Sequence, residues 1–217
     1  MELNGFSNER MNGGVGGAKR NLKIIMLYTR KGDKGTTKTL DLKPGERISK
    51  SSCRTESLGA LDELNSYLGL VRAALSRPRD LGFKTEDLKI RSKSFAEICF
   101  EVQENLFIIQ SELAGSGKAM TEMKVKAVEE LVDAAEREMP PIKTFFIPGA
   151  TELGALFDVA RTLARKAERR VVAAVEQETR VGEHTLSYLN RLSSLLYALA
   201  RLSNHKLGAS EQPPTYK

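Results

Sequence analysis

Apolar residues recur every three or four positions over five long stretches of the chain, which is the spacing of one buried helix face. We therefore predict five helices, at about 55–77, 91–114, 121–138, 151–178 and 184–207. No series of alternating apolar and polar positions indicates a sheet. Helices joined by short connections predict an all-α fold, a five-helix bundle with a ferritin-like up-down arrangement.

The chain ahead of the first helix has a different character. Residues 23–28 are short, apolar and β-leaning, so we expect an extended segment. Residues 29–38 combine glycines with cations and hydroxyls and predict a basic loop. We expect residues 1–22, which are glycine-rich and poorly apolar, to be a disordered tail, and residues 208–217 to be a loose C-terminal tail. One helical domain then spans residues 23–207.

The amino-acid composition excludes several classes of protein and of functional site. Of 217 residues, 41% are apolar and 6% aromatic, with two Cys and two His. No apolar run is long enough to cross a membrane. Two cysteines and two histidines are too few for a disulfide framework or a Cys/His metal centre, so we expect reduced thiols and no metal site. We expect a cytoplasmic protein, or a mitochondrial-matrix protein if the source is eukaryotic.

The net charge of +6 is unevenly distributed. Residues 1–50 carry eleven Lys and Arg against five Asp and Glu, whereas residues 51–217 carry twenty-three of each. A basic segment of this kind suits an anionic partner. Interleaved aromatics and nucleic-acid-binding motifs are absent from it, so a phosphate-bearing small molecule is the preferred partner over nucleic acid. The plain alternative is a solvated basic tail.

The predicted helix 151–178 has two distinct faces. Its apolar stripe consists of Leu156, Ala160, Leu163, Ala164, Ala167, Val171 and Ala174. Arg161, Arg165, Glu168 and Arg169 gather on another face. Glu168 is placed to pair with Arg165 or Arg169 on a neighbouring turn. The cluster is either a solvated face with local ion pairs or a triphosphate clamp, since guanidinium forks match phosphate oxygens.

The last predicted helix has a similar division. Its apolar stripe consists of Leu189, Leu192, Leu195, Leu196, Leu199 and Leu202, and its polar side carries Asn190, Ser193, Tyr197 and Asn204 with Arg201 near the edge. Asn190 adjoins the stripe, so it is either a semi-buried amide that needs a partner or an amide facing water.

Two further features are, taken by themselves, weak evidence for a functional site. The Gly32–Gly35 loop offers backbone N–H groups among lysines but matches neither the P-loop nor the dinucleotide fingerprint. Asp62 and Glu63 point about 100° apart on their helix. They therefore do not form a catalytic pair, and one of them is expected to form a salt bridge.

Five motifs occur in order: Tyr28–Thr37, Leu61–Ser66, Phe145–Gly149, Ala160–Arg170 and Leu189–Ser193. Together they closely resemble the ATP:cob(I)alamin adenosyltransferases of the propanediol-utilisation (PduO) type, the family of the human methylmalonic aciduria type B enzyme. The resemblance covers roughly residues 24–205.

The resemblance implies a five-helix bundle that assembles as a homotrimer with active sites between subunits. It also implies transfer of the 5′-deoxyadenosyl group of Mg-ATP to the cobalt of cob(I)alamin, with release of triphosphate. A cobalt reductase and an adenosylcobalamin-dependent acceptor enzyme are the partners expected. Since Co(I) is itself the nucleophile, no protein nucleophile or general base is required.

Particular residues acquire roles through this resemblance. Those implied to contact ATP are Thr29, Arg30, Lys31, Gly32, Thr37, Lys38, Lys50, Arg165, Lys166, Glu168, Arg169 and Asn190. Those implied to serve catalysis are Arg161, Arg165, Asp62 and Phe145. In the family, Arg161 pairs with Asp62 across the subunit interface, and Phe145 covers the lower face of the corrin.

The chain departs from the family pattern at a few positions. Asp158 stands where many relatives have His, and Ser194 where they have Asp; Lys166 replaces a common Arg and Ala150 a common Gly. The departures at Asp158 and Ser194 affect helix packing or corrin contact and spare the phosphate contacts. An escort protein that binds nucleotide or adenosylcobalamin without turnover is the alternative function, and a purely structural helical bundle is another.

Overall fold

The computed structural model describes residues 28–76 and 87–217. The predicted tail 1–22 and residues 23–27 of the predicted extended segment lie outside the described residues. The chain divides into two parts, Met1–Arg30 and Lys31–Lys217. In the first part, the Arg30 guanidinium lies 5.5 Å from the centre of the Tyr28 ring. The helices all belong to the second part.

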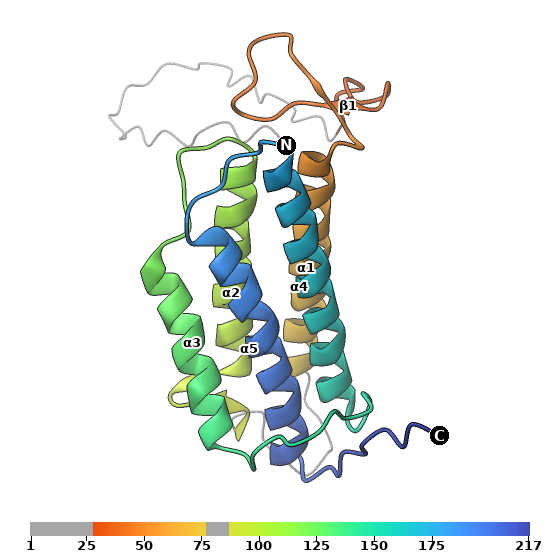
Figure 1. Ribbon diagram of the computed structural model, residues 1–217, viewed down its shortest axis with the longest axis vertical. Helices are drawn as coiled ribbons and strands as arrows, with labels where there is room; N and C mark the ends of the chain where they lie inside the picture. Colours follow the sequence, from red (N-terminus) through yellow and green to blue (C-terminus); the bar gives the residue numbers. More distant parts are fainter. Residues whose placement is uncertain (1–27, 77–86) are drawn as a thin grey trace, which may run out of the picture. The chain divides into compact units, whose positions relative to one another are not determined.

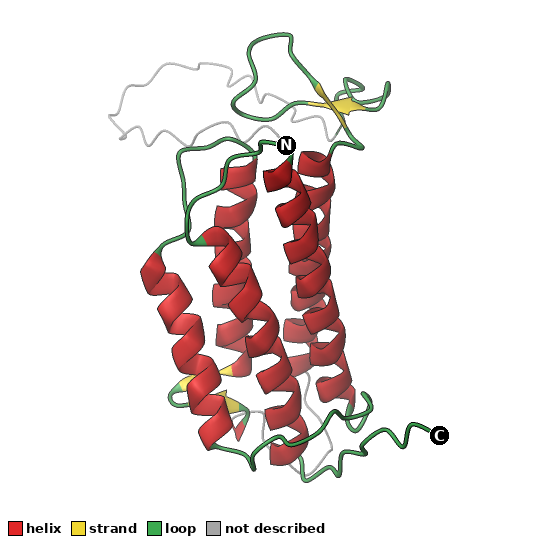
Figure 2. Ribbon diagram, in the orientation of Figure 1, coloured by secondary structure: helices red, strands yellow, loops and turns green. Residues whose placement is uncertain are grey.

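Among the described residues of the second part, five helices run side by side (Figures 1 and 2). They are α1 (Cys53–Leu75), α2 (Phe95–Leu113), α3 (Glu122–Arg137), α4 (Glu152–Glu176) and α5 (Thr185–Lys206). The prediction of five helices is therefore confirmed. Four of them agree with the expected ranges to within about two residues, because their apolar stripes are long and regular.

The start of the second helix was predicted too early. Residues 91–94 lie in a hairpin formed by β3 (Lys89–Ile90) and β4 (Lys93–Ser94), and Arg91 turns this hairpin with a φ of 55°. Ser94 then starts α2 through a reciprocal capping box with Glu97, which satisfies free N–H groups at the helix start. A second short sheet pairs β1 (Thr36–Thr37) with β2 (Ile48–Ser49). Neither sheet was predicted.

Helix α4 lies between α1 and α5, while α2 packs on α1 and α3 packs on α5. The face of α4 toward the core begins with the large buried side chains Leu153 and Phe157. It continues with small residues that are completely buried: Ala160, Ala164, Ala167, Val171 and Ala174. Small side chains allow neighbouring helices to approach closely. The predicted leucine stripe of α5 fills the space opposite, and all six of its members are fully buried.

Several polar residues of α5 do not lie where the pattern placed them. Ser193 and Asn204 were expected on a polar side and Arg201 near its edge, but all three are buried. For Asn190 two alternatives were open, a semi-buried amide with a partner or an amide facing water. It is exposed, and its amide donates to Glu168. Periodicity reports only which residues share a face, and it does not reveal that a buried charge has a partner on another element.

The chain reverses direction after α5. Gly208 adopts a φ of 65°, and the N–H of Ala209 donates to the Asn204 carbonyl, which closes the helix end. Residues 208–217 form no helix or strand. Within them, Glu211 accepts hydrogen bonds from Arg201 and Asn204.

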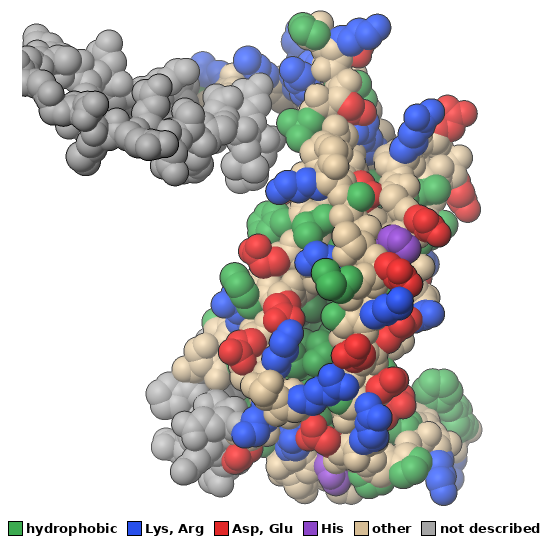
Figure 3. Space-filling model, turned by 90° about the vertical axis from the view of Figure 1, so that its left-hand side faces the viewer, with side chains coloured by type: hydrophobic (Ala, Val, Ile, Leu, Met, Phe, Trp, Pro, Cys, Tyr) green, Lys and Arg blue, Asp and Glu red, His purple; other side chains and the backbone are tan. Residues whose placement is uncertain are grey.

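The face drawn in Figure 3 carries intermixed Lys, Arg, Asp and Glu side chains, with apolar side chains visible between them. In the described ranges, no helix has both the length and the apolar character needed to cross a membrane.

Candidate functional site

The basic loop is folded tightly between Lys31 and Lys50. The N–H of Gly35 donates to the Gly32 carbonyl at 3.1 Å, and the N–H of Lys50 donates to the Gly35 carbonyl at 2.9 Å. Gly35 has a φ of 72°, which a residue with a Cβ adopts only at a cost. These bonds hold Lys50 beside the glycine turn. Lys31 and Lys38 lie exposed on the loop, whereas Thr29 and Arg30 are exposed in the first part of the chain.

The same loop is anchored to the helices through Arg54. Its Nε donates to the Leu113 carbonyl at 2.6 Å, and its guanidinium lies 2.8 Å from Asp41 Oδ1. The N–H of Leu40 also donates to the Ala114 carbonyl at 2.7 Å. The hydrogen bond from Arg54 lowers the pKa of Asp41 from its ordinary value. The loop is thus tied to the start of α1 and the end of α2.

A pocket of about 420 Å³ opens between this loop, α1 and α4. Its walls are formed by Thr37, Lys50, Thr55, Glu56, Gly59, Ala60, Glu63, Lys166 and Arg170. Three of the residues implied to contact ATP, namely Thr37, Lys50 and Lys166, therefore meet in one pocket although they come from separate elements.

The charges in the pocket are loosely paired. Lys166 Nζ lies 2.5 Å from Glu63 Oε2, and Arg170 lies 3.9 Å from Glu56. All four side chains are about half exposed. Ion pairs with this exposure contribute little stability, so an anion can replace the carboxylates as the partner of these cations. The Glu63 pair confirms that one of the carboxylates Asp62 and Glu63 forms a salt bridge.

Small residues keep the pocket open. A Cβ added to Gly59 would meet no atom within 4 Å, so this helical glycine leaves space on the pocket wall. Thr55, Gly59 and Glu63 follow one another at intervals of four residues and therefore line one face of α1. Sequence reasoning missed Gly59 and Arg170 as pocket residues. The four-residue spacing from Lys166 to Arg170 was the available signal for the latter.

A second basic group lies on another side of α4. Arg165 and Arg169 are exposed, and no ion pair or hydrogen bond of either side chain is found among the described residues. Successive helix residues are rotated by about 100°, so each of these arginines is turned by that angle from Lys166 or Arg170, which follows it directly. Neither arginine lines the pocket. Helix α4 thus presents cations in two directions.

Glu168 has a different partner from the one predicted. It was expected to pair with Arg165 or Arg169, but it accepts a hydrogen bond from Asn190 Nδ2 at 2.9 Å. Arg191 donates to Asn190 Oδ1 at 2.7 Å and to Glu129 at 2.8 Å. Asn190 projects from α5, which packs against α4, so the partner of Glu168 comes from another helix.

Arg161 and Asp62 are not paired within one chain. Arg161 Nε lies 3.6 Å from Asp158 Oδ1, and the guanidinium lies 5.9 Å from the Tyr197 ring. Asp62 is exposed on α1, and it has no ion pair with any side chain in the described ranges. Asp62 is therefore free to meet a cation from outside the chain.

The connection between α3 and α4 carries Phe145, whose side chain is 76% exposed. Its neighbour Phe146 turns inward, with its ring 5.8 Å from the Arg201 guanidinium. The N–H of Ile147 donates to the Gln212 carbonyl at 2.8 Å. An aromatic ring held in solvent in this way offers a flat apolar surface.

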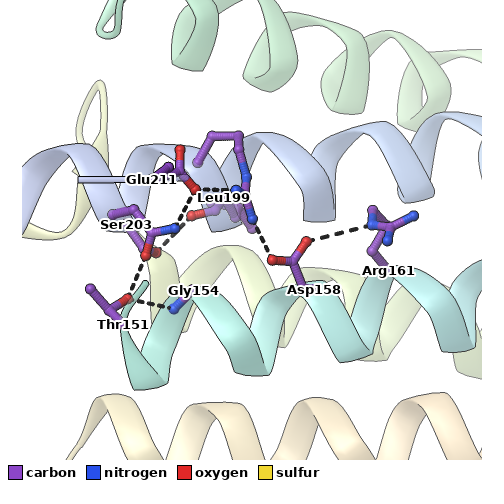
Figure 4. A network of polar contacts seen from close by, with 9 residues as sticks. Thr151, Gly154, Asp158, Arg161, Leu199, Ser203 and Glu211 are labelled. Carbon is purple, nitrogen blue, oxygen red and sulfur yellow. Dashed lines mark hydrogen bonds and ion pairs between the residues drawn. The ribbon is translucent and has the colours of Figure 1, made fainter. Parts of the chain in front are cut away.

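Asp158, one of the departures from the family pattern, belongs to a buried network (Figure 4). Its carboxylate accepts a hydrogen bond from Arg201, which also donates to Glu211. Only 2% of the Arg201 side chain and 6% of the Asp158 side chain are exposed. The second departure, Ser194, is exposed on α5.

The described residues offer little support for catalysis by a cysteine or by a bound metal ion. Burial raises the pKa of the Cys99 thiol to about 12, so this cysteine is not a thiolate at neutral pH. Among residues 28–76 and 87–217, no three His, Cys, Asp or Glu side chains gather in a way that could hold a metal ion.

Comparison with known proteins assigns the family. The sequence profile described as "Cobalamin adenosyltransferase" matches residues 27–203. The corrinoid adenosyltransferase of Bacillus subtilis is 39% identical over 187 residues, which cover 86% of this chain and 91% of the relative. The corrinoid adenosyltransferase PduO of Citrobacter freundii is 36% identical over 188 residues, covering 83% of this chain and 50% of the relative.

A similar solved structure is a variant PduO-type ATP:corrinoid adenosyltransferase from Lactobacillus reuteri, complexed with cobalamin and ATP. It superposes with a TM-score of 0.74 at 27% identity, covering 88% of this chain and 99% of that one. The motifs, the five helices and these matches agree, and the chain belongs to the cobalamin adenosyltransferase family.

Proposed function

We propose that this chain transfers the 5′-deoxyadenosyl group of ATP to the cobalt of cob(I)alamin, forming adenosylcobalamin and releasing triphosphate. The observation that carries the proposal is the pocket in which Thr37, Lys50 and Lys166 meet. The solved relative from Lactobacillus reuteri is complexed with both substrates, ATP and cobalamin. Here the ATP enters as its Mg²⁺ complex.

The proposed chemistry needs charge more than it needs a protein nucleophile. An electron pair of Co(I) attacks C5′ of ATP, the C5′–O5′ bond breaks, and triphosphate leaves with the electrons of that bond. Positive side chains that hold the triphosphate stabilise the charge that develops on O5′. Fixing ATP against the cobalt also removes much of the entropic barrier to attack.

We assign triphosphate binding to two groups of cations on different subunits. The loop group, Lys31–Lys38 with Lys50, lies beside the pocket of its own chain, together with Lys166. Arg165 and Arg169 point in another direction on α4, with Glu168 and Asn190 bound to one another nearby. A second subunit can supply these arginines to the pocket of the first. The exposed Val172, one turn beyond Arg169, gives the same surface an apolar contact.

A homotrimer with three shared sites satisfies this arrangement. Asp62 and Arg161 are then joined across the interface, which gives the exposed carboxylate a cation. The short connections α2–α3 and α4–α5 support the ferritin-like up-down arrangement of each subunit.

Phe145 is assigned to the lower face of the corrin. An apolar ring beside the cobalt excludes water and the lower axial ligand, and loss of that ligand makes reduction of Co(II) to Co(I) easier. A separate reductase would supply the electron, and an adenosylcobalamin-dependent enzyme would receive the product. We place the protein in the cytoplasm, or in the mitochondrial matrix if the source is eukaryotic.

The test is an anaerobic assay with Mg-ATP and chemically reduced cob(I)alamin. Absorbance follows formation of adenosylcobalamin, and the phosphate product is identified by ion chromatography. Adenosylcobalamin with intact triphosphate supports the transferase and attack at C5′. No turnover, with ATP still raising the melting temperature, would favour the escort function instead.

A further inference from the structure

The C-terminal segment contacts the connection that carries Phe145. Gly208 turns the chain back along α5, so Glu211 reaches Arg201 and Asn204 on the helix it has just left. One residue later, the Gln212 carbonyl accepts the N–H of Ile147 at 2.8 Å. The segment therefore forms a bridge from α5 to a position two residues beyond Phe145.

The buried charge of Arg201 holds the α5 end of this bridge in place. Arg201 is almost completely buried and lies between two carboxylates, Asp158 from α4 and Glu211 from the C-terminal segment. A buried guanidinium left without one of its partners is strongly destabilised. The network therefore favours the arrangement in which Glu211 stays against α5.

Further bonds tie the other end of the connection, as Figure 4 shows in part. Asn204 donates to Glu211 at 2.6 Å and accepts from Thr151 Oγ1 at 2.6 Å, and Thr151 also caps α4 by accepting from the N–H of Gly154 at 2.9 Å. A Cβ on Gly154 would come within 2.2 Å of Asn204 Oδ1, so glycine is required for this approach.

Phe145 lies directly before these anchored residues in the α3–α4 connection. Phe146 packs inward near Arg201, and Ile147 is held by Gln212. With its neighbour directed inward, the Phe145 ring is left in solvent.

We infer that Glu211, acting through Arg201 and the Gln212 carbonyl, is a positioning residue that holds the Phe145 connection in the geometry required for cobalt reduction. This inference rests on the role assigned to Phe145 in the proposed function. Glu211 does not touch the substrates. Its contribution is the fixed placement of an apolar ring whose own connection contains no helix or strand.

Two truncations and two substitutions test the inference in the full assembly. Deletion of residues 211–217 removes both Glu211 and the Gln212 carbonyl. Deletion of residues 214–217 keeps both, with Gln212 still in its peptide bond to Pro213, and is the matched control. Glu211→Gln keeps the length of the chain and removes one charge. Gln212→Ala leaves the main-chain carbonyl in place and is a second control.

The first readout is hydrogen exchange at the Ile147 amide, measured without cobalamin or ATP. We expect exchange to become roughly tenfold faster after deletion of 211–217, because the free energy needed to open the segment around Ile147 falls when its hydrogen-bond acceptor is lost. We expect a smaller rise for Glu211→Gln, which keeps the acceptor. Both controls should match the wild type. Wild-type exchange in both the 211–217 deletion and Glu211→Gln would overturn the inference. If the deletion does not fold, Glu211→Gln decides the question.

The second readout compares adenosylation that starts from cob(II)alamin plus reductant with adenosylation from pre-reduced cob(I)alamin. We expect a severalfold loss only from Co(II), an unchanged KM for ATP, and a matching change in the absorption spectrum of bound cob(II)alamin. Equal slowing from both states, or no slowing at all, would overturn the positioning role. Phe145→Ala separates this inference from the proposed role of Phe145. If the variant does not slow adenosylation that starts from cob(II)alamin, the proposed role of Phe145 is wrong. The hydrogen-exchange measurement still tests whether Glu211 anchors the connection.

Discussion

The side chain of Lys50 lies directly against Gly32: a Cβ built on that glycine would come within 3.0 Å of Lys50 Nζ. Gly32 thus leaves the space through which the lysine reaches the pocket. The contact joins the two ends of the basic loop, since Gly32 begins the glycine turn and Lys50 follows β2.

Gly32→Ala should therefore move the lysine without unfolding the loop, because the clash involves the far end of a flexible side chain. We expect the KM for ATP to rise roughly fivefold, which corresponds to about 1 kcal/mol of lost binding. Steady-state kinetics with varied Mg-ATP measures the effect. Gly117→Ala is the control, because a Cβ at Gly117 meets no atom within 4 Å. An unchanged KM would show that Lys50 does not contact the nucleotide.

Arg165→Ala should remove most of the activity. The guanidinium has no partner in the described part of its own chain, so its loss should spare folding and remove charge from the triphosphate. We expect kcat/KM to fall by roughly 100-fold with little change in melting temperature. Arg91→Ala, which removes an exposed arginine of the β3–β4 hairpin, provides the control. Turnover close to the wild type would remove Arg165 from the site.

Asp62→Asn should weaken the subunit interface. The substitution keeps the shape of the side chain and removes the charge that we pair with Arg161 of another subunit. We expect partial dissociation of the trimer in sedimentation velocity and a fall in rate of roughly tenfold. Asp133→Asn on the exposed face of α3 is the matched control. A trimer and a rate that both stay unchanged would contradict the pairing.

Asp41→Asn should lower stability in a pH-dependent way. The pKa of Asp41 is depressed in the folded protein, so its contribution is fully present above the unfolded value of about 3.8 and is lost as pH falls through the folded value. The carboxylate side chain is 45% exposed, so we expect less than about 1 kcal/mol at pH 7. Urea unfolding of wild type and variant at pH 7, 5 and 3 measures the difference. If the difference in unfolding free energy between wild type and variant grows toward pH 3, the prediction is contradicted.

The helices were predictable because each one buries a continuous apolar stripe, and the sequence shows that stripe without reference to any partner. The error at α2 has a local cause. Ser94 and Glu97 form a capping box that the sequence displays three residues apart, and recognising it would have moved the predicted start to the observed one.

The site was only partly predictable. The family resemblance implied Thr37, Lys50 and Lys166 as ATP contacts, but nothing in their spacing indicates that β1, the end of β2 and α4 meet at one pocket. The burial of Arg201 is the clearest example of a feature that the sequence pattern does not predict. This burial depends on Asp158, which is 43 residues away, and on Glu211 in a segment that was expected to be loose. Only the folded chain brings these charges together.

The two directions in which α4 presents its cations have a genetic consequence. In the proposed trimer with shared sites, a chain that carries Lys50→Ala and a chain that carries Arg165→Ala would each be defective in every site when alone. Coexpressed, they would assemble hybrids in which some sites draw the intact loop from one allele and the intact arginine from the other. Two such alleles would complement each other, whereas two alleles that damage the same group would not.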